Sequence, residues 1–137
     1  MWKIFFFFVI FFSCQTAENQ PVITELQGET LQMYEKGKEL FLSKCFFCHS
    51  NDMRTESTGS ALGGITTRRT KEWLHNYIRS PQNMLLERDT QAIELYNKVG
   101  VLMPDYPNLT DEEIDQILVY IEGTYHKNKI RLRPVER

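Results

Sequence analysis

Cys45-Phe46-Phe47-Cys48-His49 is a C-x-x-C-H sequence. Two thiols three residues apart, at the end of a helix, can reach the two vinyl groups of one porphyrin. The histidine that follows is then carried under the iron, where an imidazole nitrogen can bind it. This spacing is the signature of covalent c-type haem attachment. It therefore predicts one haem c held by Cys45 and Cys48, with His49 as an axial ligand.

Two other uses of a C-x-x-C pair fit the surrounding sequence less well. A thioredoxin-like pair follows a strand in a βαβ setting, whereas residues 31–44 before this pair show apolar residues at helical spacing. A structural zinc site needs four ligands, so a second Cys or His pair usually supplies the other two. The sequence has no second C-x-x-C, and His75 and His126 stand alone. The sequence favours haem over both alternatives.

The first thirteen residues have the pattern of a secretory signal peptide. Lys3 supplies one positive charge, and residues 4–12 form an unbroken apolar run that holds six of the nine Phe residues. A membrane-spanning helix needs about 20 apolar residues, so this run is too short to span and has the length of a signal h-region. We expect residues 1–13 to be removed and the protein to be exported.

A cysteine lies directly after this run. Ser13-Cys14 resembles the lipobox of bacterial lipoproteins, in which the Cys is lipidated and becomes the first residue of the mature chain. The match is loose, because Phe11 stands where that motif usually has Leu. Ordinary cleavage nearby, for example after Ala17, is the alternative. We expect lipidation at Cys14, a polar tether over residues 14–30, and a location on the periplasmic side of a bacterial membrane.

The rest of the chain predicts helices and no strands. Residues 31–44 are helical, and a second helix follows Thr70 and stops at Ser80-Pro81. A third begins at Asp89 or Thr90, and Gly100 closes it. The clearest helix starts at a Thr110–Glu113 capping box, followed by an i, i+3, i+4, i+7 apolar series: Ile114, Ile117, Leu118 and Ile121. We expect an all-α fold of four to five helices whose long loops pack on something else.

With these features together, residues 34–125 resemble the class I cytochrome c family. In that family an N-terminal helix leads into C-x-x-C-H, a loop presents an axial Met, and a C-terminal helix packs across the first. The resemblance implies that Gly37 permits a close helix crossing and that Phe41 packs there against Tyr120. It implies a cytochrome c domain over residues 31–125, wrapped around one haem, and a basic tail over residues 126–137.

The second axial ligand is expected to be Met103. It lies in Val101-Leu102-Met103-Pro104, where the family commonly has its axial Met, and 54 residues beyond His49 are enough to wrap the far face of a haem. Met53 is too close to His49, and Met84 is expected to be a packing residue. A histidine ligand or an open iron site stays as an alternative. Candidates for bonding a haem propionate are Arg68, Arg69, Trp73 and Tyr77.

The predicted function is that of a monohaem cytochrome that carries single electrons and needs no catalytic side chain. Its partners would be redox proteins held by small, transient contacts, with a lipid anchor to the membrane. The net charge of −2 argues against nucleic-acid binding. The alternative is a peroxidase-like haem enzyme or a gas sensor with an open distal iron. An enzyme would want a distal acid–base residue, usually His, and the sequence has none well placed.

Overall fold

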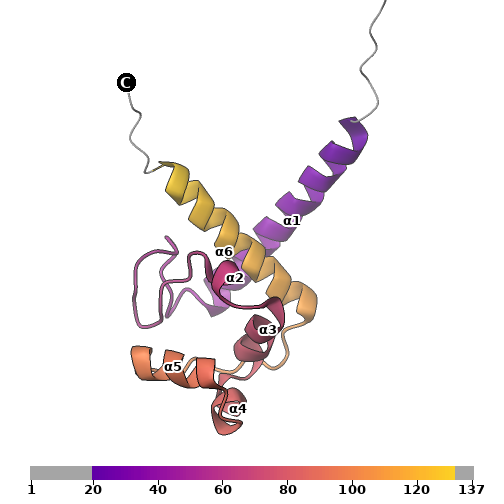
Figure 1. The fold of residues 1–137 in the computed structure, drawn as a ribbon. Coiled ribbons are helices and arrows are strands. Elements are labelled where there is room, and N and C mark those ends of the chain that lie inside the picture. The colour runs from indigo at the N-terminus through magenta and orange to yellow at the C-terminus, as the bar shows by residue number, and fades with distance from the viewer. Residues whose placement is uncertain (1–19, 132–137) are drawn as a thin grey trace, which may run out of the picture.

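The computed structural model describes the backbone of residues 20–131 and the side chains of residues 28–127. These residues form six helices and no strand (Figure 1): α1 (Gln20–Lys44), α2 (Ile65–Arg68), α3 (Lys71–Arg79), α4 (Pro81–Leu86), α5 (Thr90–Val99) and α6 (Asp111–Arg131). The all-α prediction is confirmed. The helix count exceeds the predicted four to five because α2 and α4 are too short to show a periodic pattern. The predicted signal peptide and Cys14 lie outside the described residues.

The signals that predicted helix ends act as expected. The Thr70 hydroxyl accepts a hydrogen bond from the Trp73 amide, and the Asp89 carboxylate accepts one from Ala92. The Thr110 amide donates to the Glu113 carboxylate, and the Glu113 amide donates to the Thr110 hydroxyl, which completes the capping box. The predicted stop at Ser80-Pro81 is also confirmed, but Pro81 then opens α4 as its first residue.

Two helices extend beyond their predicted limits. α1 begins at Gln20, so the second half of the segment predicted as a polar tether is helical. α6 runs on to Arg131, six residues into the tail predicted to be separate. Backbone hydrogen bonding continues a helix without an apolar stripe, and Pro21 is tolerated in a first turn. Apolar periodicity therefore marked where these helices pack, and not where they end.

The core of the molecule is the crossing of α1 and α6 (Figure 1). A Cβ on Gly37 would lie 1.9 Å from the backbone oxygen of Gln116, so the two helices meet at a distance that only glycine allows. Phe41, which is fully buried, packs on Tyr120 with ring centroids 5.3 Å apart. The structure thus has the close crossing and the aromatic pair that were expected at Gly37.

A second, smaller apolar cluster lies among α3, α4 and α5. Tyr77, Met84 and Ala92 are buried there, and Met103 packs against them. Met84 is therefore a packing residue, as expected. The cluster also sets the position of the loop after α5, which returns past the ends of α1 and α3 before α6 begins. This loop and the C-x-x-C-H turn face each other across a cavity.

Candidate functional site

A cavity of about 650 Å³ lies between the α1–α6 crossing and the helices α3 and α5. Its size falls in the range of about 300–1,000 Å³ that is typical of small-molecule and cofactor sites. The lining is mostly apolar, and the side chains from the main core include Met53, Leu74, Ile117, Leu118 and Ile121. All four residues predicted to bind the cofactor line it: Cys45, Cys48, His49 and Met103.

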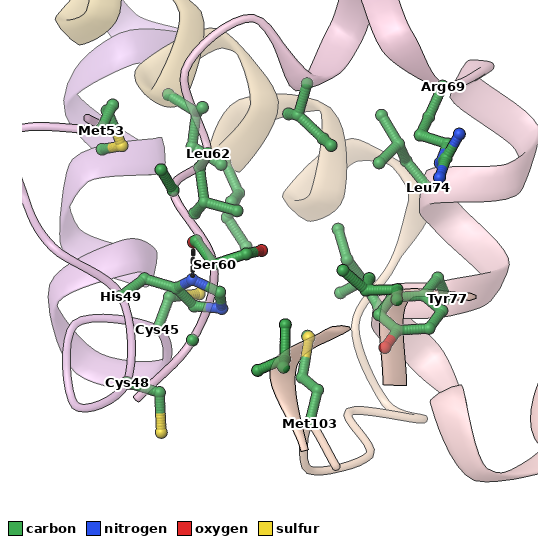
Figure 2. Close-up of a pocket in the computed structure, with 18 of the residues that line it drawn as sticks. Cys45, Cys48, His49, Met53, Ser60, Leu62, Arg69, Leu74, Tyr77 and Met103 are labelled. Atoms are coloured by element: carbon green, nitrogen blue, oxygen red, sulfur yellow. Dashed lines mark hydrogen bonds between the residues drawn. The ribbon is translucent and has the colours of Figure 1, made fainter. Parts of the chain in front are cut away.

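The C-x-x-C-H residues form a turn that continues α1 by about one helical turn. The Cys45 amide donates to the Phe41 carbonyl at 2.8 Å, and the amides of Cys48 and His49 both donate to the Cys45 carbonyl. The turn places both cysteines and the histidine on the wall of the cavity (Figure 2). Phe47, between them, is 94% exposed, so the motif has one face toward the cavity and one toward solvent.

The orientation of His49 is set by the loop that follows it. Its Nδ1 lies 2.9 Å from the Ser60 carbonyl oxygen (Figure 2). A carbonyl only accepts, so Nδ1 carries the proton and the lone pair is on Nε2. Burial lowers the pKa of His49, which favours the neutral imidazole. A neutral ring whose Nδ1–H is bonded to a backbone carbonyl is the usual form of a metal-binding histidine.

Gly59 forms part of the cradle around this ring. A Cβ at this position would lie 2.5 Å from Cε1 and 2.7 Å from Nδ1 of His49. The Gly59 amide also donates to the Cys48 carbonyl at 2.7 Å. The backbone of the loop therefore packs directly on the imidazole, and a larger residue would displace the ring or the loop.

The two cysteines are available for thioether formation. Both are free thiols and partly buried. Burial raises the pKa of Cys45 to about 11, with Lys44 acting weakly in the opposite direction. The Cys45 sulfur therefore stays uncharged at neutral pH, and a thioether sulfur in the same place would be uncharged too.

Met103 lies across the cavity from His49 (Figure 2). Its loop is tied at Tyr106, whose hydroxyl donates to the Lys44 carbonyl at 2.6 Å and whose amide donates to the Arg79 carbonyl at 3.1 Å. Tyr106 thus links the loop that carries Met103 to the residue before Cys45. Its own side chain is another part of the cavity wall.

The other candidates from the sequence also border the cavity. Met53 belongs to the main core and lines the cavity from there. The four propionate candidates line it too: Arg68, Arg69, Trp73 and Tyr77. The guanidinium of Arg68 donates to the Gly63 carbonyl, and that of Arg69 lies 5.2 Å above the Trp73 ring. Among the described residues that line the cavity, His49 is the only histidine, so they supply no distal imidazole.

Three residues of the site were not found from the sequence. Ser60 and Gly59 hold the imidazole, and Tyr106 holds the opposite loop. Ser60 and Tyr106 each act through a backbone carbonyl, and Gly59 acts by lacking a side chain. None of these roles leaves a residue pattern that spacing alone reveals.

The described residues fit a covalently bound haem better than a bare metal ion. The donor set is one imidazole nitrogen and three sulfurs around a large apolar cavity, with the cradle at Gly59 supporting the imidazole. Within residues 20–131, no group of three His, Cys, Asp or Glu residues could hold a metal ion. The four ligands of a structural zinc site are therefore not assembled in this part of the chain.

Comparisons with known proteins agree with this site. Residues 34–124 match the family model of cytochrome c. A cytochrome c from Rhodothermus marinus has a similar structure, with a TM-score of 0.62 and 26% identity over 71% of this chain and 80% of that chain. An engineered cytochrome c from Rhodothermus marinus, bound to a carbene intermediate, gives a TM-score of 0.58 and 25% identity over 70% and 80% of the two chains. A search of curated protein sequences gives no significant match.

The family match spans well over half of the chain, and the chain belongs to the cytochrome c family. Members of this family are haem-binding electron carriers, and their haem c is attached covalently. The cysteines at positions 45 and 48 have the spacing for this attachment. Members are typically exported. Over residues 20–131, no helix has the length and apolar character needed to cross a membrane.

Proposed function

We propose that the protein carries single electrons through one haem c, attached at Cys45 and Cys48 and ligated axially by His49 and Met103. The supporting observation is the opposition of His49 and Met103 across one apolar cavity (Figure 2). The hydrogen bond from His49 Nδ1 to Ser60 leaves Nε2 as the atom that can bind iron. Met103 offers a thioether on the other wall.

Each residue of the site has a definite part in this function. When bound, haem c supplies the one-electron ferric/ferrous couple that the side chains lack. Ser60 and Gly59 keep His49 in one orientation, so the site needs little rearrangement when the charge changes. Ligation by Met103 raises the reduction potential relative to a second histidine. An apolar lining around the haem would also disfavour the more highly charged ferric state.

The test of the axial pair is spectroscopic. The ferric holoprotein should show the weak near-infrared band of sulfur-to-iron ligation, and Met103→Ala should abolish it, lower the potential and admit cyanide or carbon monoxide. Met84→Ala is the matched control, because Met84 is buried in the packing cluster and should leave the band in place. If the band survives Met103→Ala and is lost with Met84→Ala, the proposed ligand is wrong and Met84 binds the iron.

The covalent link has its own test. Haem should stay with the denatured protein through acid–acetone extraction, and mass spectrometry should find one haem on the peptide that contains Cys45 and Cys48. Cys45→Ala and Cys48→Ala together should leave only extractable haem or none. Extractable haem in the wild-type protein would contradict covalent attachment.

A second candidate function is haem-based catalysis or gas binding at an open iron. It is favoured by one observation on a relative: the engineered Rhodothermus marinus cytochrome c holds a carbene intermediate. Rapid binding of carbon monoxide by the unmodified ferrous protein, together with an absent sulfur-to-iron band, would favour this candidate over the electron carrier.

The location and partners form a separate proposal. The signal pattern and Ser13-Cys14 support export and a lipid anchor at Cys14 on the periplasmic side of a bacterial membrane. One acyl chain alone gives only marginal binding, so stable anchoring needs more than one. Cys14→Ser should release the protein or leave an uncleaved precursor. A mature N-terminus downstream of Cys14 would contradict the anchor. The partners would be redox proteins bound by small, transient contacts.

A further inference from the structure

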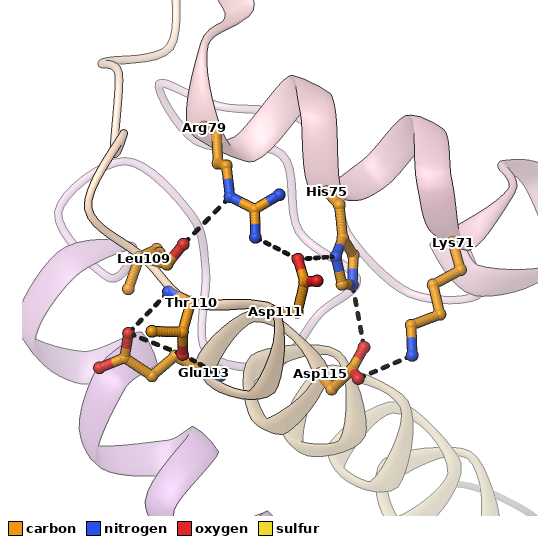
Figure 3. A network of polar contacts seen from close by, with 8 residues as sticks. All are labelled: Lys71, His75, Arg79, Leu109, Thr110, Asp111, Glu113 and Asp115. Atoms are coloured by element: carbon orange, nitrogen blue, oxygen red, sulfur yellow. Dashed lines mark hydrogen bonds and ion pairs between the residues drawn. The ribbon is translucent and has the colours of Figure 1, made fainter.

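The helix α6 is fixed to two other helices. A series of charged side chains joins its first turns to α3 (Figure 3): Lys71, His75 and Arg79 on α3, and Asp111 and Asp115 on α6. Further along, the close crossing at Gly37 holds α6 against α1. The position of α6 is therefore set by both of its neighbours, and a loop that bonds to α6 is placed relative to the whole fold.

The loop over residues 50–63 is such a segment. It leads from the attachment turn toward α2 and carries Ser60, whose carbonyl oxygen lies 2.9 Å from His49 Nδ1. Near the start of this loop, the hydroxyl of Tyr120 on α6 donates a hydrogen bond to the side-chain oxygen of Asn51. Asn51 is two residues beyond His49, so this bond reaches the loop beside the imidazole.

Tyr120 is well suited to hold the loop. Its side chain is 2% exposed, and its ring packs between those of Tyr34 and Phe41, with centroid distances of 5.1 and 5.3 Å. Burial raises the pKa of Tyr120, so the hydroxyl keeps its proton and can donate. Tyr120 is absent from the described residues that line the cavity. Its hydroxyl can therefore affect the cavity only through another residue.

The far end of the loop is also held by α6. The Gly63 amide donates to the Met53 carbonyl at 2.6 Å, which closes the loop on itself. A Cβ on Gly63 would lie 2.3 Å from the ring of Tyr125 on α6, and the Arg54 guanidinium lies 5.0 Å from the centroid of the same ring. Ser60 thus lies between two contacts with α6, one near each end of the loop.

The place of the Ser60 carbonyl matters to the atom of His49 that can bind iron. A hydrogen bond donated by Nδ1 raises the basicity of the imidazole and so strengthens Nε2 as a donor. A stronger donor favours the more highly charged ferric iron, which lowers the reduction potential. If the loop moved away, the bond from His49 to Ser60 would weaken and the potential would rise.

We propose that Tyr120 is a positioning residue for His49, acting through Asn51 and the Ser60 carbonyl, and that it lowers the reduction potential of the site. This proposal rests on the proposed axial ligation by His49. The tyrosine ring contributes to the α1–α6 crossing, and the hydroxyl contributes the orientation of the imidazole.

The experiment uses the holoprotein with Tyr120→Phe, and Tyr34→Phe as the matched control. Tyr34 belongs to the same aromatic cluster, and its hydroxyl oxygen lies 3.1 Å from Thr124 Oγ1 on α6. Each substitution removes one hydroxyl at the α1–α6 crossing, but only that of Tyr120 bonds to the loop. Three properties are measured: stability to denaturant, exchange of the His49 Nδ1 proton by NMR in the ferrous state, and the reduction potential.

Both variants should lose some stability, because each loses a hydrogen bond. In Tyr120→Phe alone, the His49 Nδ1 proton should exchange roughly tenfold faster, and the potential should rise. Asn51→Ala removes the acceptor at an exposed position and should cause the same two changes. The double variant should add nothing to either single one, because both remove the same bond.

Other results separate the two proposals. If Tyr120→Phe loses stability as Tyr34→Phe does, with unchanged proton exchange and potential, the positioning role is overturned. If the His49 ring protons of the ferric wild type show no paramagnetic shift, the ligation by His49 fails instead. If Tyr120→Phe does not fold, Asn51→Ala decides, and proton exchange and a potential equal to those of the wild type overturn the proposal.

Discussion

The two walls of the cavity are built in different ways. On the His49 wall, the contacts join residues close in sequence, such as Cys48 to Cys45 and His49 to Ser60, eleven residues apart. On the Met103 wall, the contacts join distant residues: Tyr106 bonds to Lys44, 62 residues away, and Arg79 bonds to Leu109, 30 residues away. Local contacts cost little chain entropy to form. The His49 wall should therefore be the more robust of the two.

The largest effect is expected where both walls depend on the same support, the α1–α6 crossing. Gly37→Ala places a Cβ against the Gln116 backbone, which cannot move without displacing α6. We expect a loss of about 2–4 kcal/mol in the free energy of unfolding, measured by denaturant titration of the holoprotein.

The control for this change lies on the same helix. A Cβ on Gly28 would meet nothing within 4 Å. Gly28→Ala should therefore leave the stability unchanged or raise it by up to about 1 kcal/mol, from helix propensity alone. If Gly37→Ala and Gly28→Ala lowered the stability equally, the close α1–α6 crossing would not be the cause of the loss.

The next largest effect is expected from a substitution that disturbs only the His49 wall. Gly59→Ala puts a Cβ within van der Waals overlap of the His49 ring, so either the ring or the loop must shift. We expect the free energy of unfolding to fall by about 1–3 kcal/mol and the low-spin absorption spectrum of the haem to change. Ser57→Ala, at an exposed position of the same loop, is the control. An unaltered spectrum in Gly59→Ala would show that this loop does not orient the imidazole.

A smaller effect is expected from a substitution that disturbs only the Met103 wall. Tyr106→Phe removes the hydrogen bond to the Lys44 carbonyl but keeps the ring. We expect the free energy of unfolding to fall by about 1–2 kcal/mol. Cyanide should bind faster to the ferric protein, and the covalent attachment of haem should be unchanged. Tyr96→Phe, at an exposed position of α5, should change stability by less than about 0.5 kcal/mol. Slow cyanide binding in Tyr106→Phe would contradict a role for this tyrosine in holding the loop.

The smallest expected effect is a pH-dependent contribution of one carboxylate on the His49 side to the stability of the fold. Asp52, in the loop between His49 and Ser60, accepts bonds from the Thr55 hydroxyl and from the amides of Thr55 and Arg54, which hold its pKa well below the usual range. A lowered carboxyl pKa stabilises the fold above the unfolded-state pKa, and this contribution is lost as the pH falls through the folded-state pKa.

Asp52→Asn should therefore be less stable than the wild type at neutral pH, by a small amount because the group lies near the surface. The difference should shrink and vanish in strong acid, as measured by thermal unfolding over a series of pH values. A difference that is constant down to strong acid would mean that the charge of Asp52 is not involved.

The features that could be predicted from the sequence are those that depend on neighbouring residues. C-x-x-C-H predicted the attachment motif, the caps at Thr70, Asp89 and Thr110 predicted helix starts, and the apolar series on α6 predicted the face that packs on α1. Each of these is readable because its cause lies within a few residues. The ends of α1 and α6 were missed, since a helix continues without any signal where it does not pack.

The residues that contact the attachment turn and the opposite loop could not be predicted from the sequence. That His49 bonds to Ser60, that Tyr106 reaches Lys44, and that His75 lies between two carboxylates of α6 all depend on how distant segments fold together. His75 stands alone in the sequence, because neither of its carboxylate partners is on its own helix. Backbone acceptors and side chains on other helices leave no periodic trace in the sequence, so these contacts became visible only when the helices were packed.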